Sequence, residues 1–206
     1  MTLSKDPLNL IITGVGGQGN VLASQLVGRA LVKENFYVTI GETYGASQRG
    51  GAVMSHLRIS KESQFSPLIP EGRADIIIGL EPVEALRVIG QYGNPSVAAV
   101  VNSRPIYPIA VTVGEAEYPS WEKIRETIRE LTRRAWFVDA TEIALSLGSP
   151  ILTNIIMVGA VVGTDLLPLK EGPFLEVIRE TFPEAQLQDN FAAFEKGVAT
   201  TKGHGG

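Results

Sequence analysis

Residues 8–24 read LNLIITGVGGQGNVLAS, and the fold class follows most directly from this stretch. The apolar run at 8–13 is typical of a buried strand. A loop with the spacing G-x-G-x-x-G comes next, at Gly14, Gly16 and Gly19. Apolar residues then recur at helical spacing over 20–34, and 36–40 is rich in β-branched and aromatic residues. The first 40 residues therefore predict a strand–loop–helix–strand unit that starts a parallel sheet.

The rest of the chain continues this alternation. Further strands are predicted at 52–59, 74–80, 97–101, 109–113 and 135–138. Further helices are predicted at 82–89, 121–134, 140–147, 152–162, 173–181 and 190–197. Since no repeat and no linker divides the chain, we predict one α/β domain, Rossmann-like, with a mostly parallel sheet between two helix layers. The domain is placed at residues 1–198, and a disordered tail is expected at 199–206.

Length and cysteine usage limit the classes of protein. A chain of 206 residues can bury about 70% of its unfolded surface, so a self-sufficient core is expected. The complete absence of cysteine excludes disulfides, thiolate zinc sites, a cysteine nucleophile and a cysteine-ligated iron–sulfur cluster within this chain. Only His56 and His204 remain as imidazoles, and no metal site is expected.

Charge and hydropathy limit the partners. The net charge of −4 argues against a general nucleic-acid binder, which would carry a basic surface. The N-terminus lacks the pattern of a secretory leader. The most apolar later stretch, 155–162, is far shorter than the roughly 20 residues that cross a bilayer. We therefore expect a cytoplasmic, soluble protein without a membrane partner.

The glycine loop predicts an anion site. Glycines allow the backbone to approach a phosphate closely, and the following helix offers unpaired N–H groups with partial positive charge. Alternatively, the glycines only allow the helix to pack against the strand. For a dinucleotide, Glu42 stands 23 residues after Gly19, at a spacing suited to ribose hydroxyls.

A second polar loop, GETYGASQRGG at 41–51, follows the second predicted strand. Ser47, Gln48 and Arg49 supply hydrogen-bond donors and one fixed cation, a set that suits a phosphate or a carboxylate. Taken alone, Arg49 also fits a solvated loop charge.

Several blocks of the sequence, in order, resemble one family. GVGGQGNVLAS at 14–24, GETYGASQRGGAVMSHLRIS at 41–60 and IPEGRADIIIGLEPVEALR at 69–87 resemble the gamma-type module of the 2-oxoacid:ferredoxin oxidoreductases. NIIMVGAVVGTDLLPL at 154–169 and NFAAFEKG at 190–197 resemble the closing segments of the same module (the pyruvate/ketoisovalerate oxidoreductase gamma-type catalytic domain). Within the family, the second and third blocks are most similar to the beta subunits of the indolepyruvate enzymes.

The resemblance implies a subunit that is inactive alone. The assembled enzymes of the family decarboxylate a 2-oxoacid on thiamine diphosphate, pass electrons through iron–sulfur clusters to ferredoxin, and release an acyl-CoA. This sequence lacks both the G-D-G of the thiamine diphosphate motif and every cysteine that a cluster needs. The resemblance therefore implies a larger alpha-type partner that carries both cofactors.

The resemblance also implies where this chain would act. In related enzymes the module contributes to the coenzyme A side of the active site, shared at the subunit interface. We carry this role to the matching residues, which are Gly14, Gly16, Gly17, Gly19, Ser47, Gln48 and Arg49. Related modules place lysines in the second loop where this chain has Gln48 and Arg49. No catalytic residue is assigned.

Indolepyruvate and other aryl 2-oxoacids are the expected substrates of the assembled enzyme, with aryl-acetyl-CoA as the product. The alternatives are a gamma subunit for pyruvate, 2-oxoglutarate or branched-chain 2-oxoacids, a Rossmann dehydrogenase or sensor that binds NAD, and a non-catalytic assembly module.

The remaining polar candidates receive structural interpretations. His56 lies within a predicted strand, where we favour a hydrogen-bonded structural histidine over a catalytic one. Glu81 and Glu84 flank Pro82 at the start of a predicted helix, and we favour capping roles for both. His204 falls in the expected tail and receives no role. The apolar helix at 152–162 is either plain core or part of a permanent subunit interface.

Overall fold

The computed structural model describes residues 3–44 and 51–203. Its strands are β1 (Leu8–Val15), β2 (Tyr37–Tyr44), β3 (Ala52–Ser60), β4 (Ile76–Gly79), β5 (Ala98–Asn102) and β6 (Arg134–Val138). Its helices are α1 (Asn20–Lys33), α2 (Pro82–Tyr92), α3 (Ile109–Thr112), α4 (Trp121–Leu131), α5 (Ala140–Ser146), the 3-10 turn η1 (Pro150–Leu152), α6 (Thr153–Gly163), α7 (Glu171–Thr181) and α8 (Glu184–Thr201).

All described strands form one sheet in the order β2-β3-β1-β4-β5-β6. β1, β4, β5 and β6 pair in parallel, while β3 runs antiparallel to both β1 and β2. The central strands β1, β4 and β5 are buried nearly throughout, as expected for strands covered on both faces. The predicted mostly parallel α/β fold is therefore confirmed.

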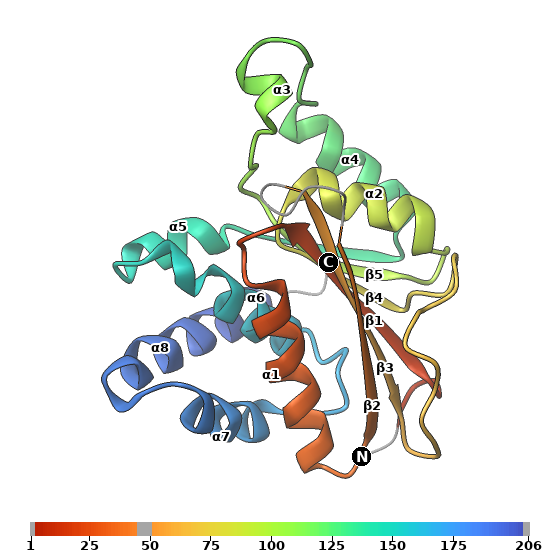
Figure 1. Cartoon of the computed structure of the whole chain (residues 1–206), viewed down its shortest axis with the longest axis vertical. Coiled ribbons are helices and arrows are strands. Elements are labelled where there is room, and N and C mark those ends of the chain that lie inside the picture. The colour runs from red at the N-terminus through yellow and green to blue at the C-terminus, as the bar shows by residue number, and fades with distance from the viewer. Residues whose placement is uncertain (1–2, 45–50, 204–206) are drawn as a thin grey trace.

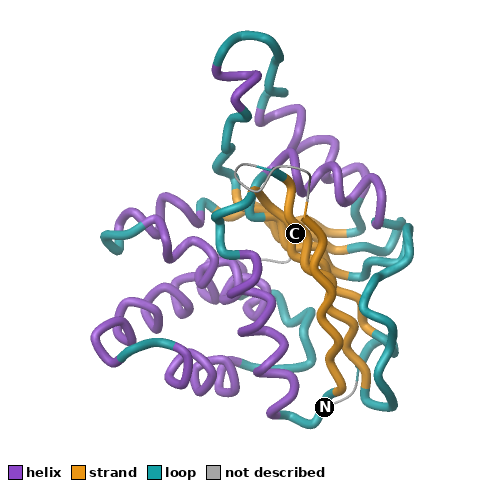
Figure 2. The backbone as a smooth tube through the Cα atoms, in the orientation of Figure 1, coloured by secondary structure: helices purple, strands orange, loops and turns teal. Residues whose placement is uncertain are grey.

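The helices cover both faces of the sheet, which gives three layers (Figures 1 and 2). One face packs against α1, α5, α6, α7 and α8, and the larger apolar core lies between these helices and the sheet. The other face packs against α2 and α4 over a smaller core. Alternate residues of one strand serve the two cores, because Leu10 and Ile12 face the first and Ile11 faces the second.

The strand–helix–strand unit at the N-terminus differs from the expectation. β1 and β2 run in the same direction but are not neighbours, because antiparallel β3 lies between them. β2 is consequently an edge strand, and its residues are only partly buried. The prediction of a strand here was right, but the prediction that it ends at Ile40 was wrong, since β2 continues to Tyr44.

The strand predicted at 109–113 was wrong. This segment forms the short helix α3, which begins after Pro108 and buries none of its residues. It lies beyond the end of β5 with no neighbouring strand, so its β-branched side chains have no sheet to pack on.

Several boundaries also differ from the expectation, those of α4 and α8 among them. The helix predicted at 121–134 ends at Leu131, and Arg134 already belongs to β6. The helix predicted at 190–197 is the second half of the longer α8, which continues to the buried Thr201. The expected tail thus begins within a helix, and residues 204–206 lie outside the described ones. In the part of the chain that the structure describes, no helix combines the length and the apolar composition that a membrane span requires.

Candidate functional site

The glycine loop lies at the carboxyl end of β1 and leads directly into α1. Gly17 and Gly19 have φ angles of +101° and +83°, in the region that favours glycine. Gly19 caps α1 without a side-chain hydrogen bond. Within the described residues, the amides of Gly17 and Gly19 donate no hydrogen bond. The loop therefore presents free N–H groups at a helix N-terminus, an arrangement suited to an anion.

The position of this loop in the sheet is the one where α/β proteins usually bind ligands. From β1 the chain crosses through α1 towards β2, whereas from β4 it crosses through α2 towards β5. The crossovers thus diverge between the carboxyl ends of β1 and β4, which makes this a topological switch point.

Gln18 closes the loop against the neighbouring strand. Its Oε1 accepts from Val15 N at 2.7 Å, and its Nε2 donates to Leu80 O at 2.9 Å. A Cβ at Gly14 would come within 2.5 Å of Gln18 Oε1, so only glycine leaves room for this side chain. Gln18 was assigned no role from the sequence, because it occupies a variable position of the motif.

Two buried asparagines beside the loop keep an unpartnered oxygen. Asn20 and Asn154 are 4% and 3% exposed, and neither Oδ1 atom has a hydrogen-bond partner among residues 3–44 and 51–203. Asn20 Nδ2 donates to Val53 O at 3.0 Å, which fixes the orientation of that amide. Asn154, at the start of α6, packs so closely on Gly19 that a Cβ there would lie 2.1 Å from its Nδ2. Buried acceptors without donors are rare in folded proteins and suit the N–H or O–H groups of a ligand.

Asn154 was not predicted as a site residue. It lies 135 positions after Gly19, and only the fold brings α6 to the glycine loop. A polar residue at the start of an otherwise apolar helix was the one available indication.

The second loop begins and ends beside the first. Tyr44 and Gly51, which bracket the undescribed residues 45–50, lie at the same edge of the sheet as Val15, since Val15 pairs with Ala52 and Tyr44 with Val53. Gly16 N donates to Gly51 O at 2.9 Å, which joins the two loops directly. The candidate residues Ser47, Gln48 and Arg49 fall outside the described residues.

Glu42 lies in β2 and not in a loop. It pairs with Ser55 of β3, which in turn pairs with Ile12 of β1, so about 10 Å of sheet separates Glu42 from β1. Its carboxylate accepts from the hydroxyl of Tyr44, and this hydrogen bond raises the pKa of Tyr44. In a dinucleotide site the acidic residue follows a strand adjacent to β1, so this topology disfavours the NAD alternative.

Glu81 has the capping role that the sequence predicts, and a second role besides. Its Oε2 accepts from Glu84 N at 2.8 Å at the start of α2. Its Oε1 accepts from Ile106 N at 3.4 Å and from the hydroxyl of Tyr118. Burial raises the pKa of Glu81, and these hydrogen bonds oppose the shift. Burial, together with the bond to Glu81, also raises the pKa of Tyr118.

His56 has the hydrogen-bonded position within a strand that the sequence analysis favours. It is buried in β3, accepts from Ile69 N at 3.4 Å through Nδ1, and packs edge-on against Tyr92. Burial lowers the pKa of this imidazole, so it is neutral at pH 7. Among residues 3–44 and 51–203, no group of three or more His, Asp and Glu could hold a metal ion.

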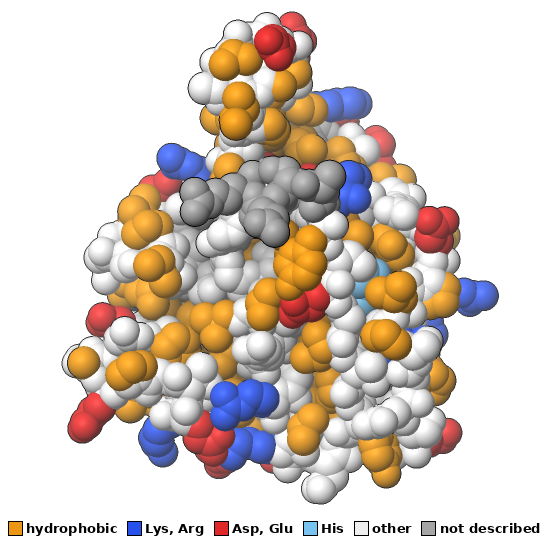
Figure 3. Space-filling model, in the orientation of Figure 1, with side chains coloured by type: hydrophobic (Ala, Val, Ile, Leu, Met, Phe, Trp, Pro, Cys, Tyr) orange, Lys and Arg blue, Asp and Glu red, His pale blue; other side chains and the backbone are white. Residues whose placement is uncertain are grey.

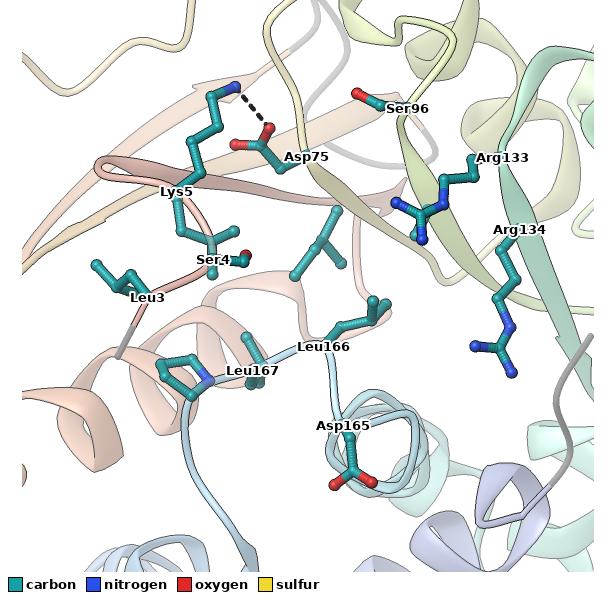
Figure 4. A pocket seen from close by; sticks show the side chains of 14 residues that line it. Leu3, Ser4, Lys5, Asp75, Ser96, Arg133, Arg134, Asp165, Leu166 and Leu167 are labelled. Atoms are coloured by element: carbon teal, nitrogen blue, oxygen red, sulfur yellow. Dashed lines mark hydrogen bonds and ion pairs between the residues drawn. The ribbon is translucent and has the colours of Figure 1, made fainter. Parts of the chain in front are cut away.

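A cavity of about 480 Å³ lies at the opposite edge of the sheet, where β1, β4, β5 and β6 begin (Figure 4). The ion pair between Lys5 and Asp75, 2.7 Å long, stands on one side, and Arg133 and Arg134 stand on the other. Because parallel strands present their carboxyl ends at the other edge, this cavity is separate from the glycine-loop site.

Comparison with known proteins identifies the family. The family model described as pyruvate ferredoxin/flavodoxin oxidoreductase matches residues 9–200. The chain belongs to this family. The indolepyruvate oxidoreductase subunit IorB of Pyrococcus horikoshii is 39% identical over 94% of this chain and 96% of its own length. The subunit of the same name from Archaeoglobus fulgidus is 40% identical over 92% of this chain and 93% of its own.

Solved structures share the fold at lower identity. The gamma subunit of a keto/oxoacid ferredoxin oxidoreductase from Geobacter sulfurreducens is 21% identical and matches 94% of this chain with a TM-score of 0.67, over 98% of its own length. The 2-oxoglutarate:ferredoxin oxidoreductase from Magnetococcus marinus, solved with 2-oxoglutarate, coenzyme A and succinyl-CoA, is 22% identical. It matches 96% of this chain with a TM-score of 0.74. There the shared fold covers only 31% of the longer chain.

Proposed function

We propose that this chain is the smaller subunit of an indolepyruvate:ferredoxin oxidoreductase. The observation that carries the proposal is the identity of 38–40% with three archaeal IorB subunits, over more than nine tenths of both sequences. The gamma subunits shared by pyruvate and ketoisovalerate enzymes are 29–30% identical. The assembled enzyme would oxidatively decarboxylate aryl 2-oxoacids in the cytoplasm, with coenzyme A as the acyl acceptor, release of CO2 and transfer of the electrons to ferredoxin.

The proposed role of this chain is to form part of the coenzyme A site. Coenzyme A carries phosphates, which suit the free amides of Gly17 and Gly19 at the start of α1. It also carries amide, hydroxyl and amino donors, which suit the unpartnered Oδ1 atoms of Asn20 and Asn154. Gly14 and Gly16 would shape the loop, and Ser47, Gln48 and Arg49 would complete the site from the second loop.

The other cofactors are assigned to the larger partner subunit. Iron–sulfur clusters are held by cysteine thiolates, and this chain contains no cysteine. Thiamine diphosphate would supply the decarboxylation chemistry on the partner. In this division, the glycine-loop edge of the present chain faces the partner and holds the acyl acceptor, coenzyme A.

A substrate panel tests the proposal. The chain is co-expressed with its larger subunit, and coenzyme A-dependent reduction of ferredoxin is measured with indolepyruvate, pyruvate, 2-oxoglutarate and 2-oxoisovalerate. We expect the highest kcat/KM with indolepyruvate and no turnover by this chain alone. A preference for one of the aliphatic acids would instead assign the chain to the gamma subunits of those enzymes.

The second loop is tested by Arg49→Ala in the assembled enzyme. Loss of one charge-assisted hydrogen bond to an anion should raise the apparent KM for coenzyme A about tenfold or more, while the KM for the 2-oxoacid stays unchanged. The matched control is Arg133→Ala, at the opposite edge of the sheet, which should leave both constants unchanged. An unaltered KM for coenzyme A in the Arg49 variant would remove this residue from the proposed site.

A further inference from the structure

One part of the fold takes no part in the site described above. The segment 103–120, called the arm here, leaves the sheet at the carboxyl end of β5, contains α3 and returns at the start of α4. Figure 1 shows it extending well beyond the rest of the molecule. Since β1 and β5 run parallel within the sheet, the arm leaves from the same edge as the glycine loop.

The arm exposes a concentration of large apolar side chains. Their exposed fractions are 40% for Ile106, 57% for Tyr107, 81% for Ile109 and 60% for Val113. Figure 3 shows the hydrophobic side chains gathered on this projection. Single exposed apolar residues are ordinary, but four within eight residues on one projection are typical of a surface that contacts another protein.

The arm is fixed to the body of the protein at both ends. Glu81 Oε1 accepts from Ile106 N near one end and from the hydroxyl of Tyr118 near the other. The rings of Tyr107 and Tyr118 also pack edge-on, with centroids 5.0 Å apart. A surface that is already held in place loses less conformational entropy when it binds. The buried carboxylate thus acts as a clamp that presents the apolar side chains in one orientation.

The charged residues of the arm indicate the chemistry of the partner surface that it fits. Arg104, at the base of the arm, pairs with Glu142 of α5 at 2.9 Å. Beyond it, between Pro105 and Ser120, the charged residues are Glu115 and Glu117, both exposed, with no lysine or arginine. A complementary partner therefore offers an apolar depression with a basic rim.

We infer that the arm docks onto the larger subunit of the same enzyme, in an apolar depression with a basic rim. The inference rests on the proposed function, which makes this chain one of two subunits. In the solved 2-oxoglutarate enzyme, this fold is covalently joined to the other 69% of a longer chain. In the proposed two-subunit enzyme, the corresponding parts are held together by surface contacts. The arm lies at the sheet edge where the shared coenzyme A site is proposed, so partner and arm meet on one side of the molecule.

The test measures binding between the two separately purified full-length subunits. In the double variant Ile109→Asp, Val113→Asp, two exposed apolar side chains become charged, and we expect the dissociation constant to rise at least about tenfold. The matched control is Val32→Asp, in which an apolar residue 56% exposed on α1 is changed away from the arm. Circular dichroism and thermal melting of each isolated variant verify that the fold is retained.

A second variant tests the basic rim. Glu115→Gln, Glu117→Gln removes the two charges without changing size, and should slow association at low salt by about threefold or more. In high salt, the difference from the wild type should disappear.

The outcomes separate this inference from the proposed function. Wild-type affinity in the double aspartate variant, or no association of the wild-type subunits, overturns the docking role of the arm. Association that depends on the arm, in an enzyme inactive on aryl 2-oxoacids, overturns the proposed function and leaves the docking surface standing.

Discussion

At the scale of single residues, the glycine loop shows how one motif serves both packing and ligand binding. Gly17 and Gly19 both have positive φ, but only Gly19 is also crowded by another side chain. The spacing of the glycines was readable from the sequence, and it correctly placed the loop between β1 and α1. The packing contact that requires glycine at position 19 could not be predicted from the sequence, because Asn154 contacts Gly19 only in the folded protein.

Alanine substitutions should separate these two requirements. Gly17→Ala carries only the cost of positive φ, so we expect the free energy of unfolding to fall by about 1–2 kcal/mol. Gly19→Ala adds a contact of 2.1 Å with Asn154 and should destabilise more strongly. The control is Gly172→Ala, where no atom lies within 4 Å of the new Cβ and no loss is expected. Urea denaturation measures all three, and equal losses at Gly17 and Gly19 would contradict the packing role of Asn154.

The carboxyl group of Glu81 should make stability depend on pH. Because its pKa is raised above 4.5, the folded state holds this proton more tightly than the unfolded chain does. The protonated carboxyl group therefore stabilises the folded state fully below pH 4.5, and this stabilisation is lost as the pH rises through the raised pKa. Glu81→Gln removes the titrating carboxyl group. The free energy of unfolding of the wild type should therefore fall towards that of the variant as the pH rises.

Tyr118→Phe is the matched test of that assignment. The hydroxyl of Tyr118 lowers the pKa of Glu81, so its removal should raise this pKa further and steepen the loss of stability with pH. Thermal melts between pH 4 and 8 provide the measurement. Parallel pH profiles for the wild type and both variants would show that Glu81 does not titrate in this range.

At the scale of elements, the helices α6 and α8 approach each other through glycine. A Cβ at Gly159 would lie 2.2 Å from Phe194 O, and one at Gly197 would lie 2.1 Å from Ile156 O. Nearly every residue of α6 is buried, and its apolar side chains belong to the larger core. Of the two interpretations of segment 152–162, this packing assigns it to the core of the chain.

Gly197→Ala should force these two helices apart. We expect a destabilisation of about 1–3 kcal/mol, despite the better helix propensity of alanine, because the neighbouring atoms are backbone and cannot rotate away. Gly90→Ala in α2 meets no atom within 4 Å and should stabilise by up to about 1 kcal/mol. Opposite shifts in melting temperature are therefore expected, and a neutral Gly197 variant would contradict the close contact.

The hydrophobic pattern of the sequence predicted the central strands, but it predicted neither the strand order nor the helix α3. The buried runs of β1, β4 and β5 were predicted because strands covered on both faces are apolar throughout. The insertion of β3 between β1 and β2 was not predicted, since local pattern carries no information on strand order. The helix α3 was mistaken for a strand because β-branched residues favour sheets only where a neighbouring strand exists.

At the scale of the whole molecule, the fold and the family were predicted from the sequence, whereas three of the seven candidate site residues lie outside the described residues. The glycine loop lies between β1 and α1, as predicted, and the strand order places it at the switch point of the sheet. The structure places three further residues beside this loop, which are Gln18, Asn20 and Asn154. Ser47, Gln48 and Arg49 stay predictions. These 206 residues contain no cysteine and therefore hold no cysteine-ligated cluster, and the proposed division of cofactors depends on assembly with a partner.

Reconstitution of activity is the decisive experiment for the proposed two-subunit enzyme. The larger subunit is purified alone, this chain is titrated into it, and coenzyme A-dependent reduction of ferredoxin by indolepyruvate is followed. We expect negligible turnover by either subunit alone and a saturable rise as this chain is added. Full coenzyme A-dependent activity of the larger subunit alone, or no activity at any ratio of the two, would contradict the proposal.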